Sequence, residues 1–171
     1  MKISITYGIL SGIIISAWII CGLTFQWYET GFAKPWNWLS YIIQVGFLYF
    51  GMQEAKVKKY EGQMSYPSAL LEGFIITLTL AVIYSLANYL YYYFAGNADI
   101  VNYALRESEK YLKEIKRPEE ILPNSKVITE AFTPGNQAVS AFKDKLITGI
   151  IFITIFAMIL RKRGETVNTT K

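Results

Sequence analysis

The sequence predicts an all-α integral membrane protein: four transmembrane helices arranged as two tandem hairpins, with a small helical extracytoplasmic insert between helices 3 and 4. Three observations predict this fold class. Hydrophobic residues make up 53% of the chain, they are collected in four long blocks, and polar segments separate the blocks. Apolar residues gathered in this way are typical of a chain that crosses a bilayer, because each crossing helix needs about 20 apolar residues.

The first apolar block, residues 5–27, is predicted to be a permanent transmembrane helix. Only Lys2 precedes it as a charged residue and no small-x-small cleavage site follows it, so we do not expect a removable signal peptide. Small residues recur at every fourth position, which places them on one side of a helix and lets another backbone approach closely. This small-residue seam consists of Ser4, Gly8, Gly12 and Ser16.

The second apolar block, Trp36 to Met52, belongs to a span predicted at about residues 36–54 and follows a short polar turn that tryptophans flank. Trp27, Trp36 and Trp38 are typical of the aromatic belt at one membrane face, where an apolar ring with a polar N–H is favoured. Gln44 lies inside this block. We expect it to form a hydrogen bond between helices, and a place along a substrate path is the less favoured alternative.

The third apolar block, residues 68–94, is the longest. As a helix it would be about 40 Å long at 1.5 Å per residue, which exceeds a bilayer core of about 30 Å. Its end is rich in tyrosines, from Tyr89 to Tyr93, which suit a headgroup boundary. Asn88 adds polarity to this helix, and we expect it to bond to the backbone or to a neighbouring helix.

Glu72 is the only residue of the third block whose side chain is charged at neutral pH in water. A charge inside a span is costly, so such a residue is by default a functional hypothesis. Because Glu72 lies near the start of its helix, it can also reach the cytoplasmic headgroups. A further alternative is a polar contact to another helix, such as to Ser11, and an ion or proton role is the remaining one.

Residues 95–140 form the predicted extracytoplasmic insert, which contains helices, and the polar segment 95–145 has as many acidic as basic side chains. Apolar residues at helical spacing predict a helix from Ala98 to Arg117, and Pro118 is expected to end it. Asn124 is the expected cap of a second short helix.

The fourth span is placed at residues 141–163 and a cytoplasmic tail at 164–171. Its apolar stretch, Leu146 to Leu160, is too short to cross a bilayer alone and must be extended upstream. Lys143, Asp144 and Lys145 are then expected near a headgroup level, with the lysine stems snorkelling to water. No charged residue is expected at the centre of any span, which argues against a proton-coupled pump.

The distribution of basic residues predicts the orientation. Four crossings put both termini on one side, together with the link between the second and third spans. The positive-inside rule assigns that side to the cytoplasm and residues 95–145 to the periplasm of a bacterial inner membrane. The basic residues on the cytoplasmic side are Lys2, Lys56, Lys58, Lys59, Arg161, Lys162, Arg163 and Lys171. They are also able to bind anionic lipids, whereas nucleic-acid binding is not expected.

An internal repeat is predicted from two short strings. Residues 10–15 and 71–76 read LSGIII and LEGFII, and each begins a span on the cytoplasmic side. Gly12 and Gly73 occupy matching positions. Two hairpins of the same topology are therefore expected, related by an axis along the membrane normal, as in some transporters.

The chain resembles a family of small four-helix bacterial inner-membrane proteins of unknown function. The resemblance rests on Tyr7-Gly8 followed by Gly12, on the run from Ser65-Tyr66 to Glu72-Gly73, on the long polar insert and on the basic ending. It covers nearly the whole chain and implies the topology but no activity. It also implies, as a partner, a membrane-linked glycosyltransferase.

The sequence predicts no enzyme. It contains no His, which removes Ser–His and Cys–His pairs, and it lacks the GxSxG, HExxH, P-loop and GxGxxG motifs. Neighbouring carboxylates such as Glu119 and Glu120 lie in a charge-mixed segment, where a solvated face is the better interpretation. We therefore predict no catalytic residue, cofactor site or metal site.

The function predicted from these features is that of a non-catalytic accessory or scaffold subunit. It would dock a membrane partner through the small-residue seam and the insert. The alternative is a small transporter or channel with Glu72 lining its path, and a lipid-handling enzyme is a weaker third. The candidate functional or helix-packing residues are Glu72, Ser11, Gly8, Gly12, Gly73, Gln44 and Asn88.

Overall fold

The computed structural model describes residues 2–30 and 33–161, and in these ranges helices are joined by turns and short loops, without a β-strand. This confirms the predicted all-α class. The helices of these ranges are α1 (Lys2–Thr24), α2 (Ala33–Tyr60), α3 (Tyr66–Phe94), α4 (Ala98–Glu114), α5 (Ile121–Ala131) and α6 (Pro134–Leu160), with 3₁₀ turns η1 (Trp27–Glu29) and η2 (Pro118–Glu120). The predicted cytoplasmic tail, and all of the basic ending except Arg161, lie outside the described residues.

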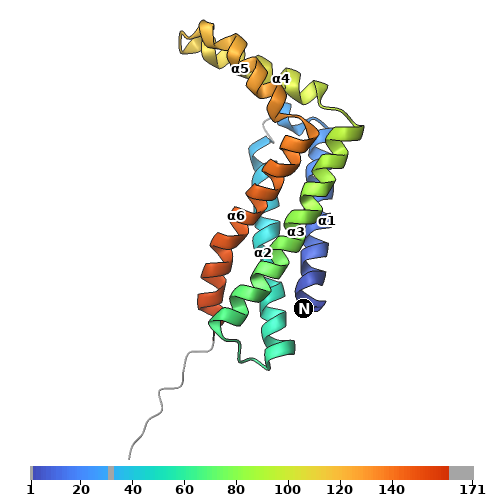
Figure 1. The fold of residues 1–171 in the computed structure, drawn as a ribbon, viewed down its shortest axis with the longest axis vertical. Coiled ribbons are helices and arrows are strands. Elements are labelled where there is room, and N and C mark those ends of the chain that lie inside the picture. The colour runs from blue at the N-terminus through green and yellow to red at the C-terminus, as the bar shows by residue number, and fades with distance from the viewer. Residues whose placement is uncertain (1, 31–32, 162–171) are drawn as a thin grey trace, which may run out of the picture.

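The four long helices form a bundle with α3 at its centre (Figure 1). Helix α3 packs most extensively against α6 and then against α1, while α2 covers the remaining side. The N-terminus, the end of α6 and the α2–α3 connection lie at one end of the bundle (Figure 1). The α4–α5 hairpin lies at the opposite end and leans away from the bundle axis.

Two of these helices, α1 and α3, are long and apolar enough to cross a membrane, by length and composition. Helix α2 contains Gln44 and a charged last turn. Helix α6 contains three consecutive charged residues at positions 143–145. Composition alone therefore supports membrane association through two helices.

The helix ends follow local sequence signals. Ser65 caps α3, because its hydroxyl oxygen accepts a hydrogen bond from the backbone N–H of Ser68 at 3.3 Å. Pro67 follows in the first turn, where its missing N–H costs nothing. Helix α1 ends at Thr24, short of the predicted Trp27, because Gln26 takes a left-handed backbone conformation with φ 55°.

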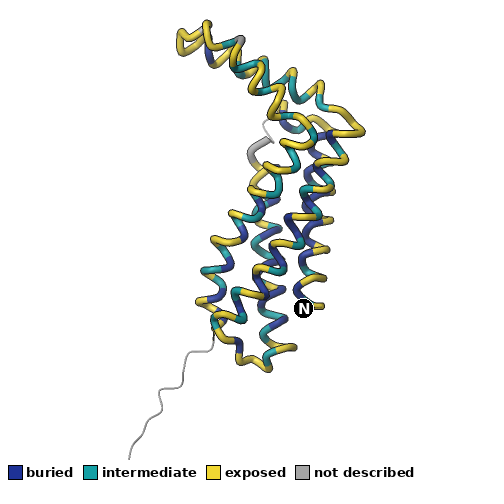
Figure 2. The backbone as a smooth tube through the Cα atoms, viewed as in Figure 1, coloured by how far each residue is buried: buried dark blue, intermediate teal, exposed yellow. Residues whose placement is uncertain are grey.

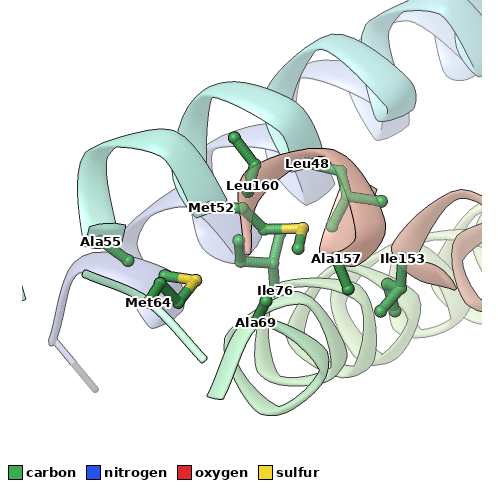
Figure 3. Packing of buried hydrophobic residues seen from close by; sticks show 9 residues of the cluster. All are labelled: Leu48, Met52, Ala55, Met64, Ala69, Ile76, Ile153, Ala157 and Leu160. Atoms are coloured by element: carbon green, nitrogen blue, oxygen red, sulfur yellow. The ribbon is translucent and has the colours of Figure 1, made fainter. Parts of the chain in front are cut away.

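The core consists of two apolar clusters, one towards each end of the bundle. The cluster beside the α2–α3 connection is shown in Figure 3 and comprises Leu48, Met52, Ala55, Met64, Ala69, Ile76, Ile153, Ala157 and Leu160. The cluster beside the α4–α5 hairpin is richer in aromatic residues and comprises Ile15, Ile19, Leu23, Tyr28, Trp36, Leu80, Tyr84 and Tyr92. Helix α3 contributes to both clusters, which explains its central position.

The α4–α5 hairpin is largely exposed, and buried residues follow the inner faces of the four long helices (Figure 2). Leu112 is the buried residue of α4. The expectation that Asn124 caps a helix is wrong, because α5 already begins at Ile121. The Asn124 amide instead donates a hydrogen bond to the Ser108 hydroxyl of α4 and ties the two helices together.

Candidate functional site

Glu72 is fully buried in the second turn of α3, close to the α2–α3 connection. Its carboxylate accepts hydrogen bonds from the Ser4 hydroxyl of α1 and from the Lys59 ammonium of α2. The Tyr60 hydroxyl donates a further bond at 2.9 Å. One carboxylate of α3 therefore joins the first turn of α1 to the last turn of α2. We call these four residues the glutamate cluster.

The charge of Glu72 is balanced by a lysine that still reaches solvent. The Lys59 side chain is 38% exposed, whereas that of Glu72 is 1% exposed. The hydrogen bond to Glu72 raises the pKa of Lys59 above its ordinary value, so the ammonium is charged at neutral pH. A buried carboxylate with a charged partner and two hydroxyl donors has its desolvation offset.

The contact partner of Glu72 differs from the one suggested by the sequence. Ser11 does not reach Glu72, since its hydroxyl donates to the backbone carbonyls of Tyr7 at 2.7 Å and Gly8 at 3.1 Å. Ser4, two turns earlier on α1, occupies that place. Helix α1 runs along α3 in the same direction, since Gly8 faces Thr79 and Gly12 faces Ile83, so the first turn of α1 lies beside the start of α3.

A second buried charge lies on α6. Lys145 is 1% exposed, and its ammonium group is 3.3 Å from the Ser40 hydroxyl and 3.3 Å from the Asp144 carboxylate. It also lies over the rings of Tyr41, at 4.2 Å, and Tyr84, at 5.1 Å. A cation over aromatic faces gains electrostatic energy that partly offsets its burial.

The expectation that the Lys145 side chain snorkels to water is therefore wrong, because the side chain is buried inside the bundle. Lys145 lies close to the middle of α6. It shares the inward face of that helix with Gly149, Ile153 and Ala157, which follow at intervals of four. Lys143, two positions earlier, is exposed on the other side.

Gln44 joins this second cluster from α2. Its amide N–H donates to the backbone carbonyl of Lys145 at 2.8 Å, which makes a hydrogen bond between α2 and α6. The amide oxygen of Gln44 is buried without a hydrogen-bond partner among the described residues. Asn88 lies on α3 and donates to the carbonyl of Tyr84 at 2.8 Å, within its own helix. We call Ser40, Tyr41, Gln44, Asp144 and Lys145 the lysine cluster.

The small-residue seam of α1 is occupied by α3. A Cβ on Gly8 would lie 2.6 Å from the Thr79 Cβ and 2.8 Å from the backbone oxygen of Ile76. A Cβ on Gly12 would lie 2.9 Å from the Ile83 Cβ. Backbone approach this close requires glycine. The seam is therefore buried within the chain rather than open to a partner.

Gly73 has a comparable role on the opposite side of α3. A Cβ there would lie 2.9 Å from Ile153 of α6 and 3.1 Å from the sulfur of Met52. Because Gly73 follows Glu72 directly, the same turn of α3 carries the buried carboxylate and the close approach of α6.

Comparison with protein families identifies the chain. The family model described as protein of unknown function (DUF4199) matches residues 6–162. The chain belongs to this family. Neither curated proteins nor solved structures gave a match to this DUF4199 protein.

In this DUF4199 protein, each buried charge is surrounded by partners from neighbouring helices, and each lies beside a serine hydroxyl, Ser4 at Glu72 and Ser40 at Lys145. Among the residues that the structure describes, no group of three or more His, Cys, Asp or Glu side chains is placed to hold a metal ion.

Sequence reasoning missed Lys59, Tyr60 and Lys145 as partners in these clusters. A signal for Lys145 was present in the spacing from Lys145 through Gly149 to Ile153, which places the lysine on a small and apolar helix face. The pairing of Lys59 with Glu72 depends on the register of α2 against α3, which sequence periodicity does not fix.

Proposed function

We propose that this protein is an integral membrane protein with four spans, α1, α2, α3 and α6, that acts as a non-catalytic accessory or scaffold subunit of a membrane complex. One observation carries this proposal: the bundle is apolar outside and partly polar inside. Serines, Gln44, Glu72 and Lys145 are buried, while large apolar side chains face outward along the long helices. These include Leu10, Ile13, Ile42, Phe50, Leu71, Val82, Leu86, Ile151, Ile155 and Ile159.

Exposed apolar surface of this extent on every long helix is unfavourable in water and favourable in lipid. Ile13 is 55% exposed on α1 and Ile151 is 56% exposed on α6. The outward faces of α2 and α6 resemble those of α1 and α3, although their whole composition is more polar. The reason is that their polar groups, Gln44 and Lys145, lie inside.

The orientation proposed for this bundle follows its basic residues. Lys56, Lys58 and Lys59 end α2, and Arg161 follows α6 at the same end of the bundle. The positive-inside rule favours the cytoplasm for this end. The α4–α5 hairpin would then lie in the periplasm of a bacterial inner membrane, with spans near residues 5–27, 36–54, 68–94 and 141–163.

The interior supports an accessory role more than transport. Between the glutamate and lysine clusters, α3 contributes Ile76 and Leu80, each 1% exposed. This packed apolar layer separates the two charged groups. A transport path past Glu72 would require this apolar layer to open, whereas a scaffold requires the layer to stay packed.

The surface proposed for a membrane partner must lie outside the seam, because α3 occupies Gly8 and Gly12. The α4–α5 hairpin is the part with least support from the bundle, and it exposes Tyr111, at 61%, and Val127, at 62%. We propose that the partner contacts this hairpin. A membrane-linked glycosyltransferase is the partner class suggested by the family resemblance.

Cysteine accessibility tests the topology directly. In a Cys21→Ser background, which has no other cysteine, Lys58→Cys and Glu109→Cys are each labelled with a membrane-impermeant maleimide in intact spheroplasts. In the intact spheroplasts we expect labelling at position 109, and we expect labelling at position 58 only after the spheroplasts are permeabilised. Equal labelling of both positions, or recovery of the protein without detergent, would refute the four-span arrangement.

The accessory role is tested by purification in mild detergent. A partner that copurifies with the wild type should be lost from Val127→Glu and retained by Lys126→Glu, a neighbouring change on the same helix. Recovery of a monomer alone from both wild type and control would contradict a scaffold role.

A further inference from the structure

A pocket of about 290 Å³ lies where the ends of α1 and α3 meet the start of α4, at the hairpin end of the bundle. Its volume is at the lower limit of small-molecule sites. The polar residues of its wall are Thr24, Gln26, Tyr28, Tyr91, Asn97 and Asp99. We call it the outer pocket. Neither buried cluster contributes to it.

The charge of the outer pocket is negative. Asp99 is the charged residue of its wall, and its carboxylate has no hydrogen bond or ion pair with another residue in the described ranges. The nearby Arg106 is engaged elsewhere, since its guanidinium donates to the Glu29 carboxylate at 2.8 Å. An unbalanced carboxylate attracts cations and repels anions.

The wall also carries aromatic surface. Tyr28 is 8% exposed and packs against Tyr103 with 5.2 Å between ring centres, and Tyr91 lies on the α3 side of the pocket. Burial, followed by the charges of Asp99 and Glu29, raises the pKa of Tyr28, so its phenol is neutral at neutral pH. Neutral aromatic rings beside a carboxylate are the combination that binds ammonium groups.

The backbone around the pocket is held in an uncommon conformation. Gln26 has φ 55° and Gly96 has φ 77°, and both line the pocket. A left-handed conformation is unfavourable for a residue such as glutamine and persists only where the surrounding structure imposes it. Gln26 lies in the turn after α1 and Gly96 in the turn between α3 and α4, so these two turns form part of the pocket wall.

We propose that the outer pocket binds a small organic cation that carries a primary or quaternary ammonium group. The ammonium would lie against the tyrosine rings with the Asp99 carboxylate as its counter-charge. No basic side chain lines the pocket to bind a phosphate or carboxylate, so the recognised moiety is the ammonium itself. This site does not depend on the proposed function, because it requires only the fold.

Binding is measured with choline and with ethanolamine as probes, by saturation-transfer NMR and calorimetry on the full chain. A polyoxyethylene detergent is suitable because it contains neither an ammonium group nor a sugar. We expect both cations to bind and Asp99→Asn to weaken each by about fivefold, the loss of one partly exposed ion pair. Glu109→Gln removes the same charge from α4 outside the pocket and should leave affinity unchanged.

Tyr28→Phe separates a cation from a hydroxylated ligand. It keeps the aromatic ring and should retain choline binding, whereas a sugar held by the phenol would be lost. Absence of choline and ethanolamine binding at tens of millimolar, or equal weakening by Asp99→Asn and Glu109→Gln, would overturn the proposal. Glucose binding that Asp99→Asn leaves unchanged would also overturn it.

The ammonium group has two sources, a lipid headgroup or a free amine. In the Cys21→Ser background, Ala98→Cys places a reporter at the pocket wall, and its maleimide labelling should be slowed by choline chloride but not by sodium chloride. Slower labelling in phosphatidylethanolamine nanodiscs than in phosphatidylglycerol nanodiscs identifies the lipid headgroup. Equal rates in both nanodiscs, with protection by choline, identify a free amine. Absence of protection by choline would refute the site.

Discussion

Removing the Lys59 ammonium should destabilise the protein more than removing the charge of its partner Glu72. Lys59→Met leaves an ionised carboxylate that is 1% exposed, with only the hydroxyls of Ser4 and Tyr60 as donors. Breaking a buried ion pair from one side costs about 3–5 kcal/mol. Because two hydroxyl donors remain, we expect about 3 kcal/mol.

Glu72→Gln should cost only about 1.5–2 kcal/mol, the lower part of the range for a hydrogen bond to a charged group. The amide can still bond to the two hydroxyls, and Lys59, whose side chain is 38% exposed, can turn to solvent. The double variant Lys59→Met/Glu72→Gln leaves no unpaired charge and should resemble Glu72→Gln. The coupling free energy of the pair then equals the cost of Lys59→Met, about 3 kcal/mol.

The assay is the free energy of unfolding in mixed micelles, from titration with sodium dodecyl sulfate followed by far-ultraviolet circular dichroism. Lys58→Met is the control, since Lys58 pairs with Glu54 at the surface and its side chain is 66% exposed. It should change stability by less than about 1 kcal/mol. A cost of Lys59→Met equal to that of Lys58→Met, or costs that simply add in the double variant, would refute this reasoning.

Three further predictions concern the same bundle. Gly8→Ala should destabilise the protein by about 1–3 kcal/mol, because its Cβ would lie 2.8 Å from the backbone oxygen of Ile76, whereas Gly46→Ala, with open space around its Cβ, should stabilise it slightly. Unfolding in mixed micelles measures both variants, and equal effects would contradict close packing of α3 against the seam. Lys145→Met should change the free energy of unfolding by less than about 1.5 kcal/mol, because the apolar replacement removes the cost of a buried charge and leaves Asp144, which is 40% exposed, in contact with water. A larger loss would show that the cation itself is required. Because the pKa of Lys59 is higher in the folded state, the contribution of Lys59 to stability should be complete at pH values below 10.5, the ordinary pKa of lysine, and be lost as the pH rises above it. In alkaline titration the wild type should lose more stability than Lys59→Met, and parallel curves would contradict this.

The sequence permitted prediction of the helices because their signals are local. Apolar blocks, Ser65 and Pro67 at the start of α3, and Pro118 after α4 each act on their own neighbourhood in the chain. The regular spacing of Gly8 and Gly12 marked a face for close helix packing, and the structure places α3 against it. Four spans and the orientation stay proposals, since composition supports membrane crossing for α1 and α3.

The clusters could not be predicted because they depend on the register between helices. Glu72 was identifiable as a costly charge, but its bonds to Ser4 and Lys59 require α1 and α2 to meet α3 at one level. Lys145 was assigned to the headgroup region because the apolar stretch Leu146 to Leu160 had to be extended upstream past it, which put it near the start of the span. Successive residues of a helix point in directions about 100° apart, so one of three adjacent charges can face inward while another faces outward.

The sequence by itself determined an α-helical chain with four apolar blocks, one isolated acidic residue in a long helix and a glycine-rich face on the first block. Only the tertiary structure decided which partners those groups have. It assigned the seam to α3, a lysine of α2 to Glu72 and an inward position to Lys145. The physical reason is that local backbone preferences set where helices begin and end, whereas burial and charge pairing depend on contacts between residues far apart in the chain.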